Sequence, residues 1–105
     1  MRIEIKDPWE MPKLRDCSVI IAWIQKHLGK HPLAKRKIFP LALLDDSSRA
    51  IVEAEEGEQF YAVVDFYRIK SGELIEKASV TMLPDPASVQ RLIDDANEEY
   101  RKKYA

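Results

Sequence analysis

The sequence predicts an α+β domain, and three observations support this prediction. Apolar residues recur with helical spacing in one segment near the start of the chain and in another at its end. Between them, from Ile38 to Leu83, the period changes to two and β-branched and aromatic residues dominate. The length of 105 residues, 33% of them charged and 46% apolar, suits one domain spanning residues 1–105. We therefore expect a four-stranded antiparallel β-meander with one helix before it and one amphipathic helix after it.

The first helix is predicted from Asp16 to Gly29. Asp16 can cap the free N–H groups of the first turn, and Gly29 can adopt the left-handed conformation that ends many helices. The predicted buried face consists of Ile20, Trp23, Ile24 and Leu28. Before this helix, Ile3 and Ile5 alternate with charged residues, a pattern typical of a short N-terminal edge strand.

Four strands are predicted over residues 38–44, 49–55, 59–69 and 74–83. Pro40 cannot donate a hydrogen bond to a neighbouring strand, so it confines the first of these strands to a sheet edge or to a bulge. Ser71 and Gly72 read as a two-residue hairpin turn between the last two strands. That turn places Asp65 opposite Ala78, and neither face of the resulting hairpin is clearly polar.

The final helix has the clearest pattern in the chain. Asp85 is a suitable N-cap, and Pro86 suits the first helical position, where its missing N–H group costs nothing. The predicted apolar stripe consists of Val89, Leu92, Ile93, Ala96, Tyr100 and Tyr104. This helix must therefore pack against another part of the protein.

We expect both helices to pack on one sheet face, because two helices of these lengths can cover one side of four strands. The other face would then expose more apolar surface than most monomers do. Homodimerisation or binding of a protein partner would cover it, so a non-enzymatic binding or regulatory role is the first functional hypothesis. The expected anchors share one face in the predicted register: Tyr61, Val63, Tyr67, Val80 and Met82.

Charge is unevenly distributed, although the net charge is only −1. The segment up to Leu44 has nine Lys and Arg against four Asp and Glu, and the rest has eight against fourteen. Lysines and arginines pair with phosphate oxygens, so nucleic-acid binding through the basic segment 26–37 is the alternative hypothesis. The side chains expected to carry it are those of Lys26, Lys30, Lys35, Arg36 and Lys37.

No catalytic group is predicted, and we expect neither a cofactor nor a metal. His27 and His31 have the four-residue spacing of two metal ligands, but Gly29 and Pro32 interrupt the helix and no third ligand is nearby. Cys17 near a helix N-terminus could have a reactive thiol, but no base lies close to it in sequence.

A small-ligand pocket is a third and weaker hypothesis. Trp23 and the Tyr100 region would line it between the sheet and the helices. Asp65, a carboxylate within an otherwise apolar strand, would provide its polar contact.

The expected location is the cytoplasm. The chain contains one cysteine, Cys17, which cannot form an internal disulfide. The N-terminal residues are charged and lack the apolar region of a signal peptide. The longest uninterrupted apolar run, Val19 to Ile24, is far too short to cross a membrane.

Overall fold

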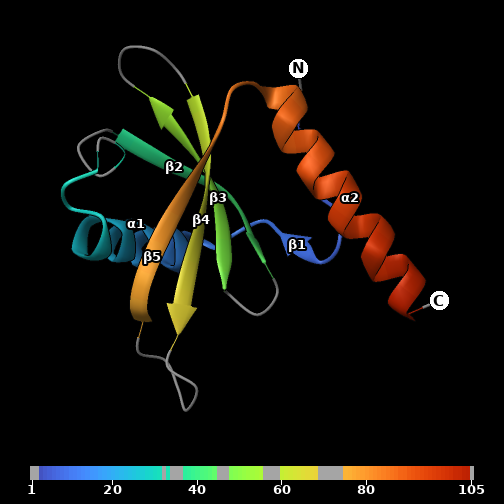
Figure 1. Ribbon diagram of the computed structural model, residues 1–105, viewed down its shortest axis with the longest axis horizontal. Coiled ribbons are helices and arrows are strands. Elements are labelled where there is room, and N and C mark those ends of the chain that lie inside the picture. Colours follow the sequence, from blue (N-terminus) through green and yellow to red (C-terminus); the bar gives the residue numbers. More distant parts are fainter. Residues whose placement is uncertain are drawn as a thin grey trace.

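The computed structural model describes residues 3–31, 33, 37–44, 48–55, 60–68 and 75–104. These residues form an antiparallel sheet and two α-helices (Figure 1). The α+β class is therefore confirmed. In chain order the elements are β1 (Trp9–Glu10), α1 (Leu14–His27), β2 (Lys37–Leu44), β3 (Arg49–Glu55), β4 (Phe60–Arg68), β5 (Ile75–Leu83) and α2 (Pro86–Tyr104).

The sheet has five strands in the order β1-β2-β3-β4-β5, so each strand pairs with its neighbour in sequence. The predicted four-strand meander is present, with one strand added at its edge. That strand is not the predicted segment around Ile3 and Ile5. Instead Trp9 and Glu10 pair with Leu44 and Leu43 of β2.

Helix α1 begins two residues before the predicted start. Lys13, at its N-cap, has an extended backbone with ψ of 162°. Asp16 is the third helical residue, and its carboxylate accepts a hydrogen bond from the Lys13 N–H at 3.2 Å. Asp16 therefore does stabilise the start of the helix, but from inside the first turn. Helix α2 begins at Pro86 as predicted, with the Ser88 N–H donating to Asp85 at 2.8 Å.

Our prediction that both helices pack on one sheet face is wrong. Ile20 and Ile24 of α1 pack against one face, together with Val52 and Val64 from the centre of the sheet. Val89 and Ile93 of α2 belong to a second core, which lies on the opposite face and includes Ile51, Tyr61, Val63 and Trp9. The physical reason is that β3 and β4 carry apolar side chains on both faces, and each face needs its own cover.

The predicted register of the β4–β5 hairpin holds for the pair Arg68 and Ile75 but is wrong by one residue from Tyr67 and Lys77 onward. Asp65 pairs with Ser79, where the two-residue turn would have placed Ala78. The irregularity that shifts the pairing lies between Tyr67 and Arg68. Because side chains alternate between faces, this shift moves the β5 side chains from Lys77 to Leu83 to the other face. The predicted turn at residues 71–72 lies outside the described residues.

Strand β2 contains the irregularity that Pro40 predicts. Its register with β3 shifts between Pro40 and Ala42. Proline lacks the N–H group that a regular ladder requires, and a bulge tolerates that loss.

Candidate functional site

Strand β5 is the last strand of the sheet, and this position leaves one of its edges open. The strand has nine residues, and β4 is its one partner among the described strands. The edge of such a strand presents backbone N–H and C=O groups that can pair with another extended chain. In Figure 1, β5 forms one side of the sheet, and α2 is displaced toward the opposite side, near β1.

Tyr67 is the main exposed aromatic residue next to this edge. It lies on β4, and 47% of its surface is exposed. Two neighbours on β5 hold its ring: the Ser79 hydroxyl donates to the Tyr67 hydroxyl at 3.3 Å, and Lys77 Nζ lies 5.0 Å from the ring centroid. The ring is thus held in place before any partner binds. Less side-chain conformational entropy is then lost on binding.

Asp65 on the same face is paired with Arg49 of β3. Arg49 Nε lies 2.7 Å from Asp65 Oδ1, although the angle at this nitrogen is not that of a hydrogen bond. The guanidinium carbon is also 5.9 Å from the centroid of the Trp9 ring. Both charged side chains are only partly exposed, and an unpaired charge in such a place would cost free energy because it is partly removed from water. The ion pair reduces this cost. It gives Asp65 a structural role.

The other face beside the edge strand carries Val80 and Met82. Val80 is partly buried and packs against the core beneath α1, whereas Met82 is 48% exposed. Tyr67 on one face and Met82 on the other therefore lie on the two sides of the β5 edge. We call the outer side of β5, together with Tyr67, Lys77, Ser79 and Met82, the β5 surface.

The structure divides the five predicted anchors between three environments. Tyr61 and Val63 are 8% and 1% exposed and lie in the core beneath α2. Burial raises the pKa of the Tyr61 hydroxyl, and the nearby Glu53 carboxylate raises it further. Tyr67 remains at the surface, and the corrected register places Val80 and Met82 on the opposite face. The predicted set is thus not one continuous surface.

The basic segment is described only in part. Lys26, Lys30 and Lys37 are exposed, and Lys35 and Arg36 lie outside the described residues. His31 Nδ1 accepts a hydrogen bond from the Leu33 N–H at 3.0 Å, so this ring nitrogen serves the local loop. Among the described residues, no three His, Cys, Asp or Glu side chains are grouped as metal ligands would be.

The hypothesis of a small-ligand pocket does not fit the arrangement of its three residues. The Trp23 ring makes an edge contact with Phe66, 5.3 Å between centroids, in the core beneath α1. Tyr100 belongs to α2, which covers the other face. The sheet separates Trp23 from Tyr100, so these residues and Asp65 cannot line one pocket.

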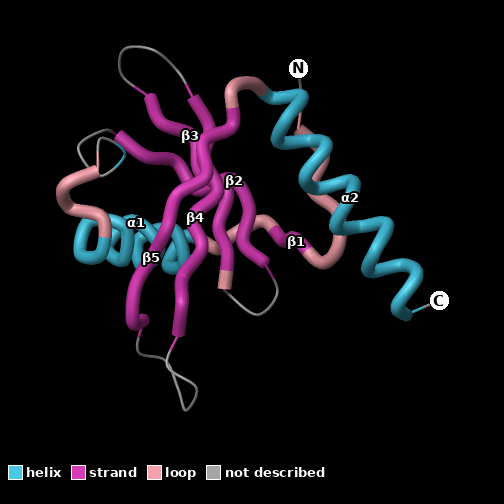
Figure 2. Tube along the Cα trace, in the orientation of Figure 1, coloured by secondary structure: helices cyan, strands magenta, loops and turns pink. Residues whose placement is uncertain are grey.

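A network that joins α2 to the N-terminal segment was not predicted. Lys6 Nζ donates to Asp94 Oδ1 at 2.9 Å, and Asn97 Nδ2 donates to the Asp7 carbonyl at 2.8 Å. Figure 2 shows the N-terminal loop passing between α2 and β1. The residues that meet here are about 90 positions apart, and periodicity within single elements contains no signal for such a contact.

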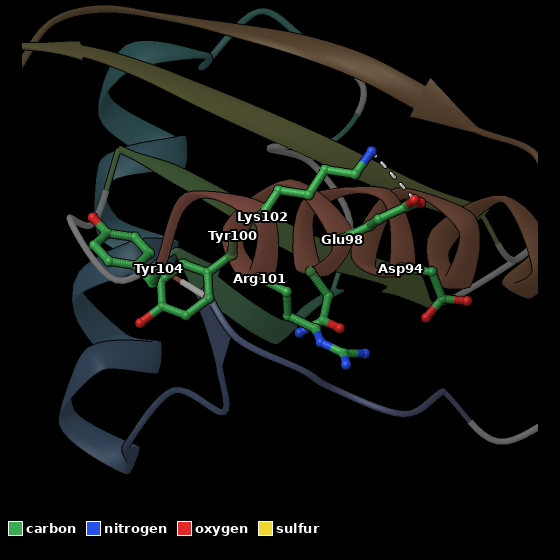
Figure 3. A pocket seen from close by; sticks show the side chains of 7 residues that line it. Asp94, Glu98, Tyr100, Arg101, Lys102 and Tyr104 are labelled. Carbon is green, nitrogen blue, oxygen red and sulfur yellow. Dashed lines mark ion pairs between the residues drawn. The ribbon is translucent and has the colours of Figure 1, made fainter.

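Two hollows lie near this network. One is lined by Ile3, Ile5, Trp9, Met11, Cys17, Phe39, Leu41, Arg101 and neighbouring residues. Cys17 is partly buried and contributes to its wall. The other runs along the C-terminal half of α2 (Figure 3).

None of the described helices is long and apolar enough to cross a membrane. Comparison of the chain with protein-family models, with curated proteins and with solved structures finds no match.

Proposed function

We propose that the protein is a non-enzymatic binding protein that acts by protein–protein association through the β5 surface. The occupant we propose is an extended segment of a partner protein that adds a strand to β5. The observation that supports this most directly is the nine-residue edge of β5, which no described strand covers. Strand addition gives affinity through backbone hydrogen bonds, and the flanking side chains give specificity.

The side chains beside the edge suit such a partner. Tyr67 and Met82 are of the types enriched in protein interfaces, and they would contact the added strand from its two faces. Lys77 lies next to Tyr67 and favours an acidic residue in the partner segment. The expected ligand is therefore an extended peptide with alternating apolar positions and at least one carboxylate.

The test selects peptides from a random library displayed on phage, using the immobilised protein as target. We expect enrichment of acidic, strand-forming sequences, and synthetic copies of them should slow amide exchange in β5. A Tyr67→Ser/Met82→Ser double variant should bind these peptides at least tenfold more weakly. Leu14→Ser is the matched control, because Leu14 is 89% exposed and lies at the start of α1, not on the sheet.

Circular dichroism of each variant shows whether it has folded. Selected peptides that bind the double variant as tightly as the original protein, or that leave exchange in β5 unchanged, would contradict the proposal. So would failure to select any peptide. Binding of a single-stranded RNA probe that weakens with salt, and is lost on changing Lys26 and Lys30 to Gln, would favour the nucleic-acid alternative.

A further inference from the structure

The apolar stripe of α2 continues past the part of the helix that the sheet covers. Val89 and Ile93, in the first half, are fully buried against the sheet. Along the second half exposure increases, and Tyr104 is 64% exposed. Figure 1 shows these last turns extending away from the strands toward the C-terminus.

The aromatic residues of this exposed half form an ordered pair. The Tyr100 and Tyr104 rings lie 4.6 Å apart, with 42° between their planes. They border a hollow whose other lining residues are Asp94, Asn97, Glu98, Arg101 and Lys102, so all of its lining residues belong to α2 (Figure 3). No other described element forms a wall of this hollow, so its open side is available to a second molecule.

The charges around the hollow suit a second copy of the same helix. Glu98 lies toward its N-terminal end, and Arg101 and Lys102 lie toward its C-terminal end. Asp94, at the N-terminal border, is already bonded to Lys6 of the same copy. A helix with this order of charges is complementary to a second copy of itself that runs in the opposite direction. A two-fold axis at the level of Tyr100 brings Glu98 of each copy opposite Lys102 of the other.

We infer that two copies of the protein associate through the C-terminal halves of their α2 helices, packed antiparallel with Tyr100 near the two-fold axis. This interface uses a different surface from the proposed strand addition at β5 and does not depend on it. Within one copy, Lys102 Nζ lies 3.5 Å from Glu98 Oε1, with 75% and 69% of the two side chains exposed. Both groups can therefore turn toward the second copy.

The small size of the interface limits its strength. Tyrosine side chains bury roughly 150–250 Å² each, so two from each copy remain below the ~1,200 Å² of a standard stable interface. The dimer should therefore dissociate on dilution, and sedimentation across a concentration series should show a monomer–dimer equilibrium.

A charge exchange tests the antiparallel arrangement directly. Glu98→Lys and Lys102→Glu, made separately, should each weaken self-association at least tenfold, because like charges then face each other. Mixing the two variants in equal amounts should restore dimers, since each copy then carries the charges that the other lacks. An ion pair within one helix cannot produce this recovery.

Glu99→Lys provides the matched control. It makes the same charge change as Glu98→Lys at the next exposed position, but Glu99 does not line the hollow. Lys103 is unsuitable as a control, because its Nζ lies 5.4 Å from the centroid of the Tyr104 ring. Glu99→Lys should dimerise like the original protein. Circular dichroism reports whether all three variants keep their helix content.

Four results would overturn the inference. One is a protein that remains monomeric up to millimolar concentration. Another is a mixture of Glu98→Lys and Lys102→Glu that associates no better than either variant alone. The third is self-association that Glu99→Lys weakens as much as Glu98→Lys does. Binding of single-stranded RNA by Tyr100, Tyr104 and the adjacent basic residues, in a protein that stays monomeric, would also reject it.

Discussion

The side-chain amide of Gln90 forms two hydrogen bonds with the backbone of Glu4. The Glu4 N–H donates to Gln90 Oε1 at 2.7 Å, and Gln90 Nε2 donates to the Glu4 carbonyl at 2.9 Å. The amide thus satisfies both backbone groups of Glu4, as a neighbouring strand would. Through this contact α2 holds the N-terminal segment in place, and Ile3 and Ile5 pack at the border of the second core.

Replacing Gln90 with Ala should release the N-terminal segment. Two hydrogen bonds at a partly exposed site contribute about 1–2 kcal/mol, so the free energy of unfolding should fall by roughly that amount. The Glu4 amide should exchange with solvent faster, as hydrogen–deuterium exchange can measure. Arg91→Ala, at the adjacent exposed position, should leave that exchange unchanged. Equal exchange rates in both variants would contradict this role for Gln90.

Acid should weaken the attachment of α2 to the N-terminal segment. Hydrogen bonds from Lys6 and from Gln90 lower the pKa of the Asp94 carboxyl below its usual value of 3.8. The resulting stability is present above pH 3.8 and is lost as pH falls through the lower pKa of the folded state. Thermal melting of the original protein should therefore depend more steeply on pH below 3.8 than melting of Asp94→Asn. Parallel curves would refute this prediction.

Alkali should destabilise the core beneath α2 through Tyr61. Its pKa is raised above the usual value of 10.0, mainly by burial and further by Glu53. A raised pKa means that stability is present below pH 10.0 and is lost as pH rises through the pKa of the folded state. Tyr61→Phe should remove this part of the alkaline loss, which denaturant titrations at several pH values can measure. Identical alkaline profiles of the two proteins would contradict the prediction.

The core beneath α1 should be sensitive to the loss of side-chain volume. Ile24 is fully buried there, so Ile24→Ala should lower the free energy of unfolding by about 2–5 kcal/mol. Val19 lies on the same helix but is 40% exposed, and Val19→Ala should change the free energy by no more than about 0.5 kcal/mol. Urea denaturation measures both values. Similar losses would mean that α1 does not bury the face described.

Much of the secondary structure could be predicted because its signals are local. Asp85 and Pro86 mark the start of α2, and Pro40 marks the irregular part of β2. The strand regions followed from their period of two and their turn residues. Of the five predicted anchors, Tyr67 is exposed, whereas Tyr61 and Val63 are in the core.

By itself, the sequence determined the α+β class, the order of the main elements and the approximate ends of the helices, since caps, prolines and periodicity act over a few residues. The tertiary structure decided which sheet face each helix covers, because β3 and β4 are apolar on both faces and local patterning cannot distinguish them. It also decided the hairpin register, where one irregularity between Tyr67 and Arg68 moves the β5 side chains from Lys77 to Leu83 to the other face. The pairing of Asp65 with Arg49 likewise follows from the neighbouring positions of β3 and β4 in the sheet.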